Sequence, residues 1–157
     1  MNVLLYGQVY KPNHRDCLLE VLTALEQEGI TPYAEPGYWS QADPEVQHHR
    51  GVSLFKDFTS TPVDVVLAFG GDGTVLGAIA MVNENQIPIM GINLGRLGFL
   101  SSIEGKVAGF AVAELAKGRY RYDQRSMIHL ETNADIFKSS KLALNDFTLH
   151  KRDNSSM

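Results

Sequence analysis

Residues 70–74 read Gly-Gly-Asp-Gly-Thr and place one carboxylate among three glycines. The residues before them, 63–69, form a nearly continuous apolar run, which is typical of a strand covered by helices on both faces. Residues 75–82 fit a helix. Glycines between a strand and a helix let backbone N–H groups approach a ligand closely, at the positive end of the helix dipole. The pattern predicts a phosphate-binding turn.

Asp72 limits the kinds of ligand and reaction that this turn can serve. Its carboxylate would repel a bare pyrophosphate, and Gly71, Gly73 and Gly77 miss the dinucleotide-binding fingerprint by one residue. No Gly-Lys-Ser/Thr sequence of a Walker loop is present either. A carboxylate fits here if it accepts the proton of a substrate hydroxyl or meets phosphates through Mg²⁺. Either role indicates phosphoryl transfer, whose loose transition state needs an oriented hydroxyl more than a strong base. The alternative is that Asp72 is only a turn residue that caps the helix.

The segments around this turn predict an open parallel sheet. Strands are expected over residues 2–10, 30–34, 63–69 and 87–92, and helices from Asn13 as N-cap to Gly29, over 75–82, and over 107–117 with Gly118 as the stop. Alternating strands and helices indicate an α/β fold. Ligands in such folds bind at the carboxyl ends of the strands, which is where residues 70–74 lie. Residues 35–50 carry no clear pattern.

The pattern changes after Gly118. Residues 120–132 and 141–151 read as extended segments with no helix between them. We therefore expect residues 1–118 to form an α/β nucleotide-binding domain. Residues 119–157 are expected to form the incomplete beginning of a second, β-rich domain.

Composition excludes several classes of protein. The chain has 157 residues with 14 Lys+Arg against 18 Asp+Glu, and this net charge of -4 disfavours nonspecific binding to nucleic acid or anionic membranes. Its single cysteine, Cys17, cannot form an internal disulfide, and a packing role is expected for it. No Cys/His spacing matches a zinc site, and the adjacent His48 and His49 are expected on the surface. We expect a cytoplasmic protein that binds small-molecule nucleotides.

Three motifs together resemble the NAD kinases. They are residues 70–74, residues 91–100 (Gly-Ile-Asn-Leu-Gly-Arg-Leu-Gly-Phe-Leu) and residues 143–146 (Ala-Leu-Asn-Asp), in the family's order and approximate spacing. The first motif is shared with diacylglycerol and sphingosine-type lipid kinases and, loosely, with phosphofructokinases. The second and third are more specific to NAD kinases. The resemblance covers nearly the whole chain and implies a Rossmann-like, phosphofructokinase-like N-terminal domain.

The resemblance also implies a reaction and a set of site residues. The reaction is ATP-dependent phosphorylation of the 2′-hydroxyl of the adenosine ribose of NAD, with a divalent metal, Mg²⁺ being expected, in a homo-oligomeric full-length protein. No residue of this chain is assigned as a metal ligand. The residues that match the family are the catalytic aspartate Asp72, the binding-turn glycines Gly71 and Gly73, the adenine-side aromatic Phe99, and the pair Asn145 and Asp146 that holds the ribose and amide of NAD.

Two departures from the family qualify this assignment. Some members carry a basic residue where this chain has Gly77. Family members also continue past residue 157 into a β-rich domain that completes the NAD site, so little activity is expected from residues 1–157 alone. A lipid kinase and a noncatalytic nucleotide-binding module remain the alternatives. Phe99 as a core residue, and Asn145 and Asp146 as a bulge or strand end, are the structural alternatives for those positions.

Overall fold

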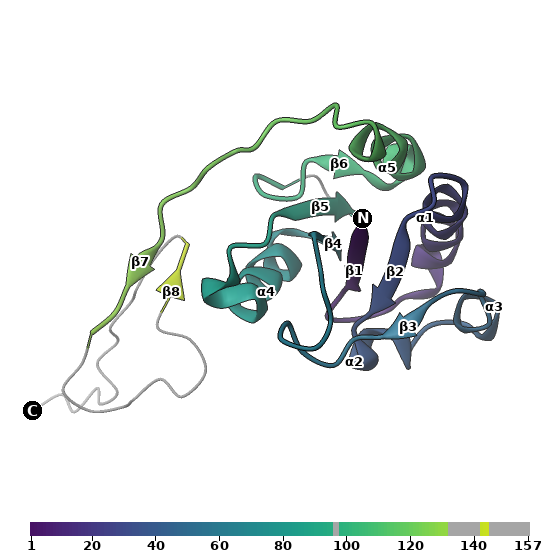
Figure 1. Ribbon diagram of the computed structural model, residues 1–157, viewed down its shortest axis with the longest axis horizontal. Coiled ribbons are helices and arrows are strands. Elements are labelled where there is room, and N and C mark those ends of the chain that lie inside the picture. Colours follow the sequence, from purple (N-terminus) through teal and green to yellow (C-terminus); the bar gives the residue numbers. More distant parts are fainter. Residues whose placement is uncertain (96–97, 132–141, 145–157) are drawn as a thin grey trace, which may run out of the picture. The chain divides into compact units, whose positions relative to one another are not determined.

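The computed structural model describes residues 1–95, 98–131 and 142–144 (Figure 1). The chain divides into two compact units, Met1–Tyr122 and Asp123–Met157, and each is described by itself. This division falls close to the expected domain boundary after Gly118. How the complete protein divides into domains stays a prediction.

The larger unit is built on a six-stranded sheet with the order β3-β2-β1-β4-β5-β6. Every neighbouring pair of strands is parallel, which confirms the predicted α/β fold. β1 and β4 are adjacent at the centre, and the strands on either side of them run outward in opposite order, so a ligand crevice is expected at their carboxyl ends. The strands are β1 (Asn2–Tyr6), β2 (Thr31–Ala34), β3 (Ser53–Leu54), β4 (Val65–Phe69), β5 (Ile89–Asn93) and β6 (Ile103–Glu104).

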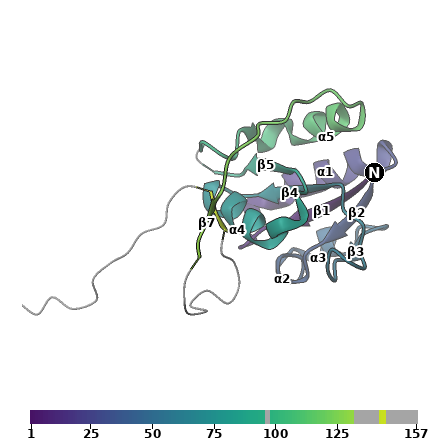
Figure 2. The same ribbon diagram turned by 60° about the vertical axis from the view of Figure 1, so that its left-hand side comes forward.

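Helices cover both faces of this sheet, with α1 and α5 on one side and α4 on the other (Figures 1 and 2). The helices are α1 (Arg15–Gln27), α2 (Pro36–Trp39), α3 (Pro44–Gln47), α4 (Asp72–Val82) and α5 (Ala108–Ala116), with 3-10 turns η1 (Pro12–His14), η2 (Asn83–Asn85) and η3 (Gly105–Val107). The segment 35–50, which carried no clear sequence pattern, holds the two short helices α2 and α3.

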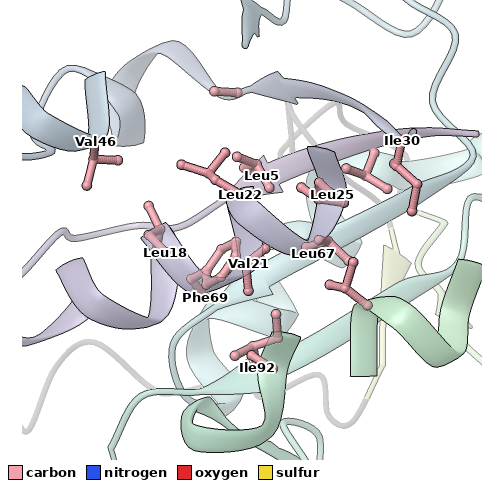
Figure 3. Close-up of a cluster of buried hydrophobic side chains, with 14 of the residues drawn as sticks. Leu5, Leu18, Val21, Leu22, Leu25, Ile30, Val46, Leu67, Phe69 and Ile92 are labelled. Atoms are coloured by element: carbon pink, nitrogen blue, oxygen red, sulfur yellow. The ribbon is translucent and has the colours of Figure 1, made fainter. Parts of the chain in front are cut away.

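Successive residues of β4 point to opposite faces, and both faces are buried. Leu67 and Phe69 pack in one cluster with Leu22 of α1 (Figure 3). Val66 packs in a second cluster with Val75 of α4. Burying a large aliphatic or aromatic side chain stabilises the fold by about 1.5–3 kcal/mol. This two-sided burial explains the continuous apolar run and fixes the carboxyl end of β4, where the glycine turn starts.

Three local expectations differ from the structure. β1 ends at Tyr6 and not at residue 10, because its neighbours β2 and β4 end beside it. Asn13 does not cap α1, since it lies inside the 3-10 turn that begins at Pro12. α4 begins at Asp72 and not at residue 75. The predicted helix stops at Gly29 and Gly118 are confirmed, with φ of +65° and +70°.

In the smaller unit, β7 (Ile128–His129) pairs antiparallel with β8 (Leu142–Ala143). These two strands lie within the predicted extended segments. In the part of the chain that the structure describes, no helix is both long enough and apolar enough to cross a membrane.

Candidate active site

The turn after β4 places Asp72 at the carboxyl edge of the sheet. Gly70 has a φ of +153°, a backbone conformation that side chains disfavour, and a Cβ at this position would collide with the side chain of Thr74. The Gly70 N–H donates to the carbonyl of Ile92 at 2.9 Å, which ties the turn to β5. Asp72 follows two residues later as the first residue of α4. A glycine at position 70 therefore sets the direction in which the helix leaves the sheet.

Open space surrounds the other two glycines of the turn. Gly71 and Gly73 are exposed, and a Cβ added at either position would meet no atom of residues 1–95, 98–131 and 142–144 within 4 Å. Within the described residues, no hydrogen bond reaches the backbone N–H of Asp72 or Gly73 at the start of α4. Unpaired N–H groups at the positive end of a helix attract anions. The structure thus has the donors and the space for a phosphate at the predicted place.

The carboxylate of Asp72 does not cap its own helix. It accepts hydrogen bonds from three consecutive backbone N–H groups of the segment 98–101, which follows β5. The N–H of Phe99 donates to Oδ2 at 2.9 Å, and the N–H groups of Leu100 and Ser101 donate to Oδ1 at 2.9 and 3.1 Å. The Ser101 hydroxyl adds a fourth contact to Oδ1 at 3.3 Å. The alternative of a simple helix cap is therefore wrong.

These contacts give the two carboxylate oxygens of Asp72 different numbers of hydrogen-bond donors. A carboxylate offers about two acceptor sites on each oxygen. Oδ1 already receives both N–H donors of Leu100 and Ser101, together with the serine hydroxyl. Among the described residues, Oδ2 receives only the N–H of Phe99. Oδ2 is therefore the oxygen of Asp72 that can accept a further hydrogen bond, such as one from a substrate hydroxyl.

The same contacts lower the pKa of Asp72 below its ordinary value. The N–H of Leu100 has the largest effect, followed by those of Phe99 and Ser101, because each stabilises the charged form. Asp72 is only partly buried, so desolvation opposes this shift weakly. The group is an anion at neutral pH, with a negative charge that the amides partly compensate. The Asp72 carboxylate therefore repels a nearby phosphate less than a carboxylate without these hydrogen bonds would.

This lowered pKa predicts how stability depends on pH. The pKa of Asp72 is lower in the folded protein than in the unfolded chain, where it is about 3.9. The ionised carboxylate therefore stabilises the folded protein above about pH 3.9, and this stabilisation is lost as the pH falls through the pKa of the folded state. Thermal unfolding of wild type and Asp72→Asn should therefore differ by a constant amount between about pH 8 and pH 5, and the difference should shrink below about pH 4. A difference that disappears already near about pH 6 would contradict the hydrogen bonding described above.

The remaining predicted residues have different outcomes. Phe99 is 93% exposed, so its interpretation as a core residue is wrong and its ring is available to a ligand. Asn145 and Asp146 lie outside the described residues. At Gly77, a Cβ would approach both Gln8 Nε2 and Tyr6 Oη to 2.6 Å. The space beside this glycine is filled by the side chains of Tyr6, at the end of β1, and Gln8, which follows β1.

Sequence reasoning missed Gly98 and Ser101, which contact Asp72 from the next loop. A Cβ at Gly98 would collide with the Asp72 carboxylate. Ser101 is fully buried against the same group. The motif over residues 91–100 contained the only available signal, a glycine directly before Phe99.

The described residues offer few ligands for a metal ion. Among residues 1–95, 98–131 and 142–144, no three His, Cys, Asp or Glu side chains come together as a metal site. Mg²⁺ is often held by one or two carboxylates together with substrate phosphates. The divalent metal implied by the resemblance fits this site if the phosphates bring it and Asp72 is its nearest carboxylate.

A separate cavity of about 450 Å³ lies at the start of α1 and does not include Asp72. Its walls carry the carboxylates of Asp16, Glu20 and Glu104 and the ammonium of Lys106, which pairs with Glu104 at 2.6 Å. This excess of negative charge disfavours phosphate there. Cys17 also lines the cavity, and burial raises the pKa of its thiol to about 11, in agreement with a packing role.

Comparison with known proteins identifies the family. Residues 15–120, more than half of the chain, match the family described as the ATP-NAD kinase N-terminal domain. The chain belongs to the ATP-NAD kinase family. This match includes the turn at residues 70–74 and the loop that binds Asp72.

Relatives in the ATP-NAD kinase family support the same assignment. An NAD kinase of Bacteroides fragilis is 38% identical over all of this chain and 54% of its own length. One of Cytophaga hutchinsonii is 38% identical over 67% of this chain and 37% of its own length. The chain therefore spans about half the length of the curated relatives that it matches throughout. The lipid-kinase alternative is not favoured by any of these matches.

A solved structure shares the fold. The crystal structure of yeast NADH kinase complexed with NADH matches with a TM-score of 0.66 and 21% sequence identity, over 90% of this chain and 45% of the yeast chain.

Proposed function

We propose that this chain supplies the phosphate-binding turn and the catalytic aspartate of an NAD kinase. The enzyme transfers the terminal phosphoryl group of ATP to the 2′-hydroxyl of the adenosine ribose of NAD and releases NADP and ADP. The observation that carries this proposal is the Asp72 carboxylate, fixed by three amides at the carboxyl edge of the sheet with Oδ2 still able to accept a hydrogen bond. We refer below to the complete protein, which is this chain together with a C-terminal half like that of its relatives.

Asp72 acts on the hydroxyl chiefly by orienting it. The 2′-hydroxyl donates to Oδ2, which directs its oxygen lone pair at the terminal phosphorus of ATP. As the new O–P bond forms and the bond to ADP breaks, the hydroxyl becomes acidic and its proton passes to Oδ2. The lowered pKa of Asp72 suits this late transfer, because a weak base needs an already acidic hydroxyl.

The start of α4 binds the phosphates. The unpaired N–H groups of Asp72 and Gly73 and the helix dipole together provide an anion site, and the glycines let phosphate oxygens come close. A divalent metal bound to those phosphates would neutralise part of the negative charge that develops on the leaving group.

The remaining contacts to NAD follow from the family resemblance. The exposed Phe99 ring packs against the adenine, and Asn145 and Asp146 hold the ribose and amide groups. We further propose a cytoplasmic, homo-oligomeric enzyme. The domain that follows residue 118 completes the NAD site, so residues 1–157 alone give only trace turnover.

Isothermal titration of ATP and of NAD, separately, into residues 1–157 tests nucleotide binding, and NADP formation by the complete protein tests the reaction. Heat on titration of ATP and NADP formation by the complete protein support the proposal. A complete protein that phosphorylates diacylglycerol and not NAD would contradict it. Robust NADP formation by residues 1–157 alone would contradict the need for the second domain.

Gly73→Ala separates binding from folding. Alanine is favoured over glycine inside a helix, and no atom that the structure describes lies within 4 Å of the new Cβ, so the variant should gain about 0.5–1 kcal/mol in stability. Its methyl group nevertheless occupies the space in which phosphate oxygens approach the backbone. We expect a higher melting temperature together with at least about tenfold weaker ATP binding by titration, roughly the loss of one charged hydrogen bond.

Gly95→Ala provides the matched control, since Gly95 is an exposed loop glycine that also has no atom of the described residues within 4 Å of its Cβ position. It should bind ATP as the wild type does. Equal ATP affinity in Gly73→Ala and wild type would show that the phosphates of ATP do not bind at this turn.

A further inference from the structure

Ser101 is a buried polar residue that links Asp72 to the sheet. It has no exposed surface and directly precedes the exposed Ser102, which lies just before β6. Its Oγ lies 3.3 Å from Asp72 Oδ1 and 3.2 Å from the Nδ2 of Asn93, the last residue of β5. Asn93 is 5% exposed. The side chains of the three residues form a continuous path from the end of β5 to the first residue of α4.

The hydrogen bonds along this path have one direction. The Oδ1 of Asn93 accepts from the N–H of Gly95 at 2.7 Å, which fixes the orientation of the amide. Its Nδ2 can only donate, and it donates to both the Oγ and the carbonyl of Ser101. The Ser101 Oγ therefore accepts from Asn93, and its single proton is directed at Asp72. Hydrogen bonds arranged in such a chain strengthen one another.

We propose that Ser101 is a positioning residue for Asp72 and that Asn93 orients its hydroxyl. This inference rests on the proposed function. Together with the N–H groups of Leu100 and Ser101, the hydroxyl holds Oδ1 with three donors. The carboxylate cannot rotate about its Cβ–Cγ bond without breaking these contacts. Oδ2 is thereby kept in one place to receive the 2′-hydroxyl, and orientation of reacting groups is a large part of catalysis in phosphoryl transfer.

Ser101→Ala removes the hydroxyl and leaves the backbone N–H in place. Ser102→Ala is the matched control, since it removes the hydroxyl of the neighbouring exposed serine. The first readout is the pKa of the Asp72 carboxyl, which is measured by a ¹³C NMR titration of residues 1–157. The second is NADP formation by the complete protein, with kcat and the KM for ATP measured separately.

We expect the pKa of Asp72 to rise in Ser101→Ala and to stay unchanged in Ser102→Ala, because only the first loses a donor to the carboxylate. We expect kcat to fall about tenfold in Ser101→Ala, since a hydrogen bond to a charged group is lost. The KM for ATP should stay unchanged, because the turn at residues 70–74 is intact. A residue with only a structural role would shift neither the Asp72 pKa nor kcat in a folded variant.

Asn93→Asp is a second variant that keeps the acceptor for the Gly95 N–H and removes the donor to Ser101. The Ser101 proton then has two competing carboxylates, so kcat should fall here as well. An unchanged Asp72 pKa in Ser101→Ala, or wild-type kcat in both variants, would overturn the positioning role. A complete protein without NAD kinase activity would overturn the proposed function, and the NMR titration would still show whether Ser101 binds the carboxylate.

Discussion

The Asp72→Asn variant of the complete protein is expected to lose about 10²- to 10⁴-fold in turnover while keeping its fold, because a proton acceptor contributes about that much to catalysis. An asparagine has one carbonyl oxygen in place of two carboxylate oxygens. The best position for this oxygen is that of Oδ1, where the N–H groups of Leu100 and Ser101 both donate. With the Ser101 hydroxyl, which also donates there, the fold therefore retains three of the contacts to the loop.

The loss falls on the other oxygen. With the carbonyl in the Oδ1 position, the amide nitrogen occupies the place of Oδ2, where the N–H of Phe99 now faces another donor. The amide nitrogen cannot accept a hydrogen bond from the ribose hydroxyl and cannot take its proton. Binding of ATP to the turn should change little, since the backbone N–H groups at the start of α4 are unaffected.

Steady-state NADP formation measures this effect, and far-UV circular dichroism checks the fold. Asp16→Asn is the control, because it makes the same chemical change at a side chain that is 91% exposed on α1. It should leave turnover at the wild-type level. Turnover close to wild type in Asp72→Asn would contradict the role of Asp72 as the proton acceptor.

The sheet could be predicted from the sequence because its signals are local. The apolar run that ends at Phe69 reflects burial on both faces of β4, and Gly29 and Gly118 mark helix ends with positive φ. The position of Asp72 at the carboxyl edge follows from the same pattern, since strand, turn and helix are consecutive. The short helices within residues 35–50 were missed because each has only four residues and too few positions to show a period.

The partners of Asp72 could not be predicted in this way. Phe99 and Ser101 lie 27 and 29 residues away from it, and their backbone N–H groups carry no sequence signal. Which residues meet across two loops depends on the strand order, which places β4 beside β5. The sequence alone therefore favoured an aspartate that faces a ligand, and the structure adds that the loop binds both of its oxygens, with three donors on Oδ1 and one on Oδ2.

Gly98→Ala should lower both turnover and stability. A methyl group at this position would collide with the Asp72 carboxylate, so the segment 98–101 must move away from it. Displacing this segment lengthens the bonds from the N–H groups of Phe99 and Leu100. Strain from an added methyl group in a packed site typically costs about 1–3 kcal/mol. A displacement near 1 Å of a catalytic group typically costs about 10²-fold in rate, and we expect a fall in turnover of that order.

Gly95→Ala again serves as the control, because it adds the same methyl group to the same loop, where no atom in the described part of the chain lies within 4 Å of it. Of the two added methyl groups, only the one at position 98 would meet the Asp72 carboxylate. Thermal unfolding and NADP formation should change in Gly98→Ala alone. A Gly98→Ala enzyme with the turnover of Gly95→Ala would mean that the loop is not what holds the aspartate. If the prediction holds, position 98 must be glycine because the Asp72 carboxylate occupies the space that a Cβ would need there, a requirement imposed by the first residue of α4.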